Sequence, residues 1–182
     1  MTNAEPVRFD LATGQVDTGT GERLLLIPLA TLDAFAATAG VEMASRLARG
    51  VGVSIGRRLA QRLGSTDGVR AATLESFVTD FAREVALSGW GSLSLERWGK
   101  AMLISVDHAP VKERALMAAL IEGAIEAAAG SEVHGTLLSG EPVRVLLTSA
   151  NAASRARSWT AEGASAGEVI ARLHDATRGA GE

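Results

Sequence analysis

The chain of 182 residues contains no cysteine. This absence excludes disulfides, thiolate metal sites, thiol nucleophiles and thioester-linked lipids, and it favours a reducing compartment. The sequence also lacks the run of about eighteen apolar residues that a membrane-spanning helix requires. A basic stretch followed by an apolar one is missing from residues 1–6. We therefore expect no signal peptide, no membrane insertion and a cytoplasmic location.

Neither sign of charge dominates, and aromatic residues are scarce. The formal net charge is −3, and aromatic residues make up 4% of the chain. Proteins that bind nucleic acid usually combine a basic balance with aromatic side chains that stack on bases. We therefore expect no nucleic-acid partner. A solvated helix face is the simpler interpretation of the arginines that could form a basic stripe, which are Arg46, Arg49, Arg57, Arg58 and Arg62.

Motifs for catalysis, cofactors and metals are also missing. His108, His134 and His174 stand apart from one another, so a metal site would have to be assembled from distant elements. Residues 50–52 begin like a dinucleotide fingerprint, but the third glycine, Gly56, falls one residue too late. No nucleophile elbow or phosphate-binding loop occurs. We therefore expect no catalytic residue, no metal and no cofactor, and we favour a binding protein over an enzyme.

Apolar residues are abundant enough for one folded domain, since they make up 47% of the chain. Segments with strand and helix periodicity predict an α+β fold, in which two hairpins form a four-stranded antiparallel sheet packed against helices. We divide the chain into an N-terminal hairpin extension (1–30), an α/β domain (31–149) and a C-terminal helical tail (150–182).

The first thirty residues and the helices after them are predicted from local patterns. Alternating apolar residues at 7–11 indicate a strand, and residues 24–27 are its expected hairpin partner. Helical spacing then begins at Thr31, continues through residues 51–63 and returns from Thr73 to residue 87. Asp67-Gly68 is expected to form a turn between the last two segments.

The two hairpins of the sheet flank a central helix. Residues 93–98 and 101–108 surround Gly99-Lys100, a pair that suits a tight turn. Residues 133–138 and 143–148 form the second hairpin, after a helix over 112–129. In the tail, a helix is expected over 151–159, and a capping box formed by Ser165 and Glu168 starts another. The apolar edge of this last helix comprises Val169, Ile170 and Leu173.

Small residues recur at every fourth position from Ala36 to Gly64. Each glycine inside a helix costs roughly 1 kcal/mol relative to alanine. Close approach of another helix would offset that cost, although an alanine- and glycine-rich composition could produce the row by chance. Each four-residue step rotates the row by about 40° around the helix axis, so its members cannot all face one partner. We therefore expect either a break in the helix near residues 50–52 or two packing partners along the row. The candidates for helix packing or a dimer contact are Gly40, Ala44, Ala48, Gly52, Gly56 and Ala60.

Large apolar side chains gather on the helix at 73–87, the first hairpin and the central helix. An ordinary core would explain them. The sharper hypothesis is an elongated apolar pocket between helices and sheet, because such side chains line most ligand pockets. The candidate lining residues are Phe77, Phe81, Trp90, Trp98, Met102 and Met117.

The order helix, helix, hairpin, helix, hairpin is anchored by segments 56–60, 88–91, 116–130 and 133 onward. With these anchors, residues 31–148 resemble the 4-vinyl reductase domain, a bacterial and archaeal family of predicted hydrocarbon-binding proteins that shares its fold with core subunits of the TRAPP transport complexes. The resemblance implies a dimer formed through helices and a small apolar or lipid-like ligand. Family members often carry cysteines in the closing hairpin, and none occurs here, so a thiol-dependent metal or acyl-attachment role is unsupported.

Three functions follow as hypotheses. The first is a dimeric, non-enzymatic module that binds or senses a small apolar molecule. The second is a protein–protein interaction scaffold whose interior is filled by its own side chains, with a second protein on the C-terminal helix. The third, which rests on family analogy alone, is an accessory role in tetrapyrrole or bacteriochlorophyll metabolism.

Overall fold

The computed structural model describes residues 7–178. Within this part of the chain, no helix is both long and apolar enough to cross a membrane. In chain order the elements are β1 (Val7–Asp10), β2 (Gln15–Thr18), β3 (Arg23–Leu24), α1 (Leu29–Ala39), α2 (Val41–Arg62), α3 (Thr66–Ala71), α4 (Leu74–Leu87), β4 (Ser92–Trp98), β5 (Ala101–Asp107), α5 (Ala115–Ala129), β6 (His134–Leu138), β7 (Val143–Thr148), α6 (Ala150–Ala161) and α7 (Ala166–Arg178).

The predicted α+β fold is confirmed. A four-stranded antiparallel sheet has the order β4-β5-β7-β6, so each predicted hairpin forms and the two hairpins join along β5 and β7. Gly99 has a φ of 65° at the β4–β5 turn, a conformation that glycine adopts without strain. The central helix α5 ends at Gly130, which has a left-handed conformation.

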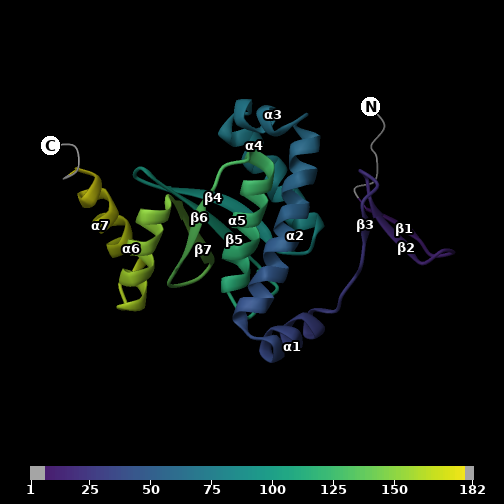
Figure 1. Ribbon diagram of the computed structural model, residues 1–182, viewed down its shortest axis with the longest axis horizontal. Helices are drawn as coiled ribbons and strands as arrows, with labels where there is room; N and C mark the ends of the chain where they lie inside the picture. The colour runs from purple at the N-terminus through teal and green to yellow at the C-terminus, as the bar shows by residue number, and fades with distance from the viewer. Residues whose placement is uncertain (1–6, 179–182) are drawn as a thin grey trace.

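Helices cover both faces of this sheet. Figure 1 shows α2 and α5 on one side, and α6 and α7 on the other. Adjacent strand residues point to opposite faces, so Ile104 joins the core under α2, α4 and α5, while Leu103 joins the core under α6 and α7. The two cores are called here the first and the second cluster.

The N-terminal region is a three-stranded meander rather than a single hairpin. β1 pairs with β2, and β2 pairs with the short β3. The expected pairing of residues 7–11 with 24–27 is therefore wrong. The Asp10 carboxylate accepts hydrogen bonds from the backbone N–H groups of Ala12 and Thr13, which closes a tight turn directly after β1. Residues 25–27 lie beyond β3 and are exposed.

One of the two alternatives for the row of small residues, a break near residues 50–52, is excluded, and the turn expected at Asp67-Gly68 is wrong. The helical segment breaks at Gly40, where φ is 83°, and not near residues 50–52; α2 runs without interruption from Val41 to Arg62. A short helix, α3, replaces the turn expected at Asp67-Gly68. The Ser65 hydroxyl accepts a hydrogen bond from the Gly68 N–H and so caps that helix.

The C-terminal tail follows its predicted pattern closely. α6 and α7 flank a capping box in which the Ser165 N–H and hydroxyl donate to the Glu168 carboxylate, while the Glu168 N–H donates back to the Ser165 hydroxyl. The apolar edge of α7 is buried in the second cluster, so in this fold it packs against the chain's own sheet and α6.

Candidate functional site

The six residues predicted to line a pocket do not lie together. Phe81 and Met117 are fully buried in the first cluster with Trp90, and Phe77 packs against it. Trp98 packs against the second cluster, on the opposite face of the sheet. Successive side chains along a strand point to opposite faces, and the position of Trp98 in β4 points to the face covered by α6 and α7. Met102 is exposed. The four residues of the first cluster fill a core, and the sheet separates Trp98 from them.

The middle of the row of small residues, at Gly52 and Gly56, lies along the contact between α2 and α5. A Cβ atom on Gly52 would overlap the carbonyl oxygen of Leu120, and one on Gly56 would overlap that of Ala124. Ala44 and Ala48 are also buried in the first cluster, and Ala60 packs against it. Gly40 stands apart from this contact because it forms the break between α1 and α2.

A cavity of about 300 Å³ lies between the meander, α2 and α4. Its wall on the meander side is formed by β1, the β2–β3 turn and β3, and its opposite wall by the second half of α2 and the end of α4. The residues that line it are Val7, Thr18, Gly19, Thr20, Leu24, Arg58, Gln61, Arg62, Arg83, Glu84, Leu87 and Ser88.

A buried ionic network forms the floor of this cavity. Arg58 is 6% exposed and Glu84 is 2% exposed, and Arg58 Nε donates to Glu84 Oε2 at 2.8 Å. Arg62 Nη2 donates to the other oxygen of Glu84 at 2.5 Å. Arg58 Nη2 donates to the Ser88 hydroxyl at 2.8 Å. Since a buried charge is stable only when it is paired and hydrogen-bonded, these contacts hold the guanidinium in a fixed position.

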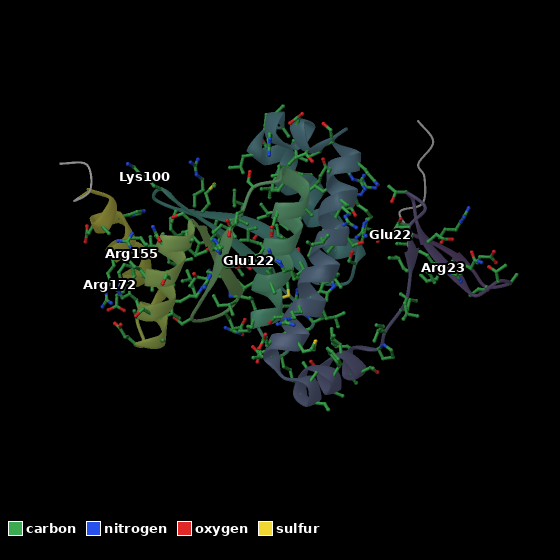
Figure 2. All side chains as sticks on the ribbon, viewed as in Figure 1. Glu22, Arg23, Lys100, Glu122, Arg155 and Arg172 are labelled. Carbon is green, nitrogen blue, oxygen red and sulfur yellow. The ribbon has the colours of Figure 1, made fainter. Side chains whose placement is uncertain are left out.

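Glu22 completes the network from the meander. Its Oε2 accepts from Arg58 Nη1 at 2.5 Å, and its Oε1 accepts from the Ser54 hydroxyl. Figure 2 labels Glu22 on the side of the meander that faces α2. The carboxylate therefore lies on the same guanidinium that forms the floor of the cavity.

The pKa values within this network favour its charged form. Burial raises the pKa of the Glu22 carboxyl, but Ser54 and Arg58 lower it by more, so it lies below the ordinary value of 4.5. Burial lowers the pKa of the Arg58 guanidinium, but Glu84 and Glu22 raise it by more. Glu22 and Arg58 are accordingly both charged at neutral pH.

The expectation that Arg58 lies on a solvated helix face is wrong, and this site was therefore not among those predicted from the sequence. A signal was present in α4. Glu84 lies three residues after Phe81 and next to Val85, on the apolar face of an amphipathic helix. A carboxylate at such a position requires a buried cationic partner, and the arginines of α2 supply it.

A second cavity, of about 420 Å³, lies between the β5–α5 connection and the β6–β7 turn. His108 at its edge has a φ of 55°, which is uncommon for a residue other than glycine. Its charged residues lie near the surface, and Arg114 is already paired with Glu141. Nowhere in residues 7–178 do three side chains gather in a way that suits a metal ion. The cavity at Arg58 is therefore the better-built site.

The fold defines the class of this protein: an α+β domain whose four-stranded antiparallel sheet lies between two helical layers. A solved structure of the same class is the crystal structure of the phenol-responsive sensory domain of the transcription activator PoxR with phenol, which aligns with a TM-score of 0.57 and 15% identity over 78% of this chain and 83% of that one. No protein-family model and no curated protein matches the chain by sequence. At this identity the likeness shows the fold alone, and the resemblance to the 4-vinyl reductase domain stays a prediction.

Proposed function

We propose that this chain is a small-molecule-binding domain of the sensory kind, and that its ligand occupies the cavity between the meander, α2 and α4. The observation that carries the proposal is the buried, charged floor at Arg58 and Glu84 beneath an otherwise partly apolar cavity. Ligand pockets typically enclose roughly 300–1,000 Å³ and combine apolar walls with a few fixed polar groups. The fold shared with a phenol-responsive sensory domain agrees with this role.

The proposal differs from the expected apolar pocket between helices and sheet, because the side chains of the first cluster fill that space themselves. This filled interior is the observation that favours the alternative function, an interaction scaffold without a ligand. The apolar edge of α7, expected to bind a second protein, packs within the chain instead. The cavity at Arg58 makes ligand binding the better-supported function of the two.

We propose further that the protein is a homodimer. α1 has no buried residue, and large apolar side chains are exposed on the linker before it, on α1 itself and on the first turns of α2. A group of this kind usually marks an interaction surface. Its members are Leu25, Leu26, Ile27, Leu29, Phe35, Val41, Met43 and Leu47, called here the N-terminal apolar surface.

The binding proposal is tested by filling the cavity. Saturation-transfer NMR measures binding of a panel of small aromatic and aliphatic acids, amides and alcohols, phenol included. Leu87→Trp places a large ring in the cavity wall, whereas Leu74→Trp changes an exposed residue of the same helix. We expect binding to the wild type and to Leu74→Trp, and loss of binding in Leu87→Trp. If no compound binds, or if both variants bind equally well, the proposed site is wrong.

A further inference from the structure

The lining of the cavity at Arg58 is positively charged. Three arginines (Arg58, Arg62 and Arg83) face it, against one glutamate. That glutamate, Glu84, is shared between Arg58 and Arg62. Arg83 forms no salt bridge with any residue in the described part of the chain. Arg58 is also paired with Glu22, and Arg62 lies 3.9 Å from Asp80, so Arg83 is the lining arginine to which the described residues supply no acidic partner. An anion placed in this cavity would meet that charge together with the desolvated guanidinium of Arg58.

A carboxylate of the protein already occupies one end of this charged surface. The two oxygens of Glu22 take separate donors, the Ser54 hydroxyl and Arg58 Nη1. Glu22 is also more accessible than its partner, since its side chain is 39% exposed and that of Arg58 is 7% exposed. Ser54 and Arg58 are four residues apart on α2, so one turn of helix holds the two donors at a fixed spacing.

The meander holds Glu22 in place only weakly. Across residues 7–178, every side-chain hydrogen bond and ion pair from the meander to the helices passes through Glu22. The strands of the meander pack extensively only on one another, and the side chains of Phe9 and Leu11 are exposed. Moving Glu22 away from α2 would therefore break its two polar contacts and little apolar packing.

Building on the proposed binding function, we infer that the cavity takes a small organic carboxylate, and that Glu22 occupies the carboxylate position when no ligand is bound. The two oxygens of the ligand would accept from Ser54 and Arg58 in place of those of Glu22. Val7, Leu24 and Leu87 would contact its hydrocarbon body. Because the ligand remakes both hydrogen bonds, exchange leaves no buried donor unpaired.

Benzoate and benzamide, which differ in charge but hardly in shape, test the inference by titration calorimetry or NMR. Wild-type protein is expected to bind benzoate at least about tenfold more tightly than benzamide, since hydrogen bonds to charged groups contribute more than neutral ones. Glu22→Gln removes the competing charge and should tighten benzoate binding about tenfold. Asp17→Asn is the matched control, because Asp17 is a carboxylate of the meander that pairs with Arg8 rather than with Arg58. It should bind benzoate as the wild type does.

The outcomes separate this inference from the proposed function. Equal affinities for benzoate and benzamide, both abolished by Leu87→Trp, would overturn the carboxylate inference and leave the binding site in place. Failure of every compound to bind, or binding indifferent to Leu87→Trp, would overturn both. Unchanged benzoate affinity in folded Glu22→Gln would overturn the role of Glu22. Should that variant not fold, the ratio of the two affinities in the wild type and in Asp17→Asn still decides the ligand class.

Discussion

Gly52 of α2 lies so close to Leu120 of α5 that a Cβ atom on Gly52 would overlap the Leu120 carbonyl oxygen. The contact is reciprocal along the helix pair. A Cβ on Gly123 of α5 would come within 2.5 Å of the Arg49 carbonyl oxygen. Small residues on both helices thus allow their backbones to touch, and α5 is held against the sheet by the same helix that carries Arg58.

Gly52→Ala is expected to destabilise the fold, because the new methyl group meets backbone atoms that cannot move independently. Overpacking of this kind costs roughly 1–3 kcal/mol in the free energy of unfolding, measured by urea denaturation. Gly50→Ala is the control on the same helix. Gly50 is exposed with no atom near its Cβ position, so that change should stabilise by up to about 1 kcal/mol. Equal effects of the two substitutions would refute a steric requirement at Gly52.

Glu96 should make stability depend on pH in acid. Burial raises the pKa of its carboxyl, but Arg144, Ser105 and Trp98 lower it by more, so the folded pKa lies below 4.5. A lowered folded pKa stabilises the protein fully above the unfolded pKa, and this stabilisation is lost as the pH falls through the folded value. The difference in free energy of unfolding between wild type and Glu96→Gln should therefore shrink from pH 6 toward pH 3.

The control for Glu96 is Glu42→Gln. Glu42 forms an exposed i,i+4 pair with Arg46, and such surface pairs contribute little to stability. Its pH profile should follow that of the wild type. A constant difference between wild type and Glu96→Gln across the range would contradict the assigned contacts of Glu96.

The sheet and its hairpins could be predicted because their signals are local. The period-two pattern on both sides of Gly99, and the continuous apolar face of α5, specify their structures within short windows. The signal for the turn after β1 is also local. The apolar run at residues 24–27 was the stronger signal, and residues 7–11 were therefore predicted to pair with it. The Asp10 turn closes the hairpin earlier, so Leu24 pairs with β2 in the short β3 and Leu25, Leu26 and Ile27 are left exposed.

The site could not be predicted in the same way because its contacts are distant in sequence. Arg58 meets Glu84 across 26 residues and Glu22 across 36 residues. Periodicity assigns Arg58 to a polar position on its helix, and only the packing of α4 and the meander makes that position buried. The six predicted pocket residues do not lie together for a related reason. The alternation of side chains along β4 places Trp98 on the face of the sheet that carries the second cluster.

The proposed dimer predicts that charge on the N-terminal apolar surface separates the two copies. Phe35→Glu combined with Met43→Glu should lower the mass measured by light scattering from twice that of the chain to that of one chain, because both side chains are exposed on the isolated subunit. Leu74→Glu alters an exposed apolar residue on α4 and should leave the mass unchanged. A wild-type protein with the mass of one chain at micromolar concentration would rule the dimer out.

The last prediction concerns the apolar edge of α7. A core role and a partner-binding role for this edge have different consequences for the stability of the isolated protein. Ile170 is buried in the second cluster of this chain, so Ile170→Ala should lower the free energy of unfolding by roughly 2–5 kcal/mol. Asp175→Ala, an exposed position of the same helix, should change it by less than about 0.5 kcal/mol. Thermal and urea denaturation of the isolated protein measure both. If Ile170→Ala is as stable as Asp175→Ala, the edge does not belong to the core, and a second protein becomes the better explanation for its apolar residues.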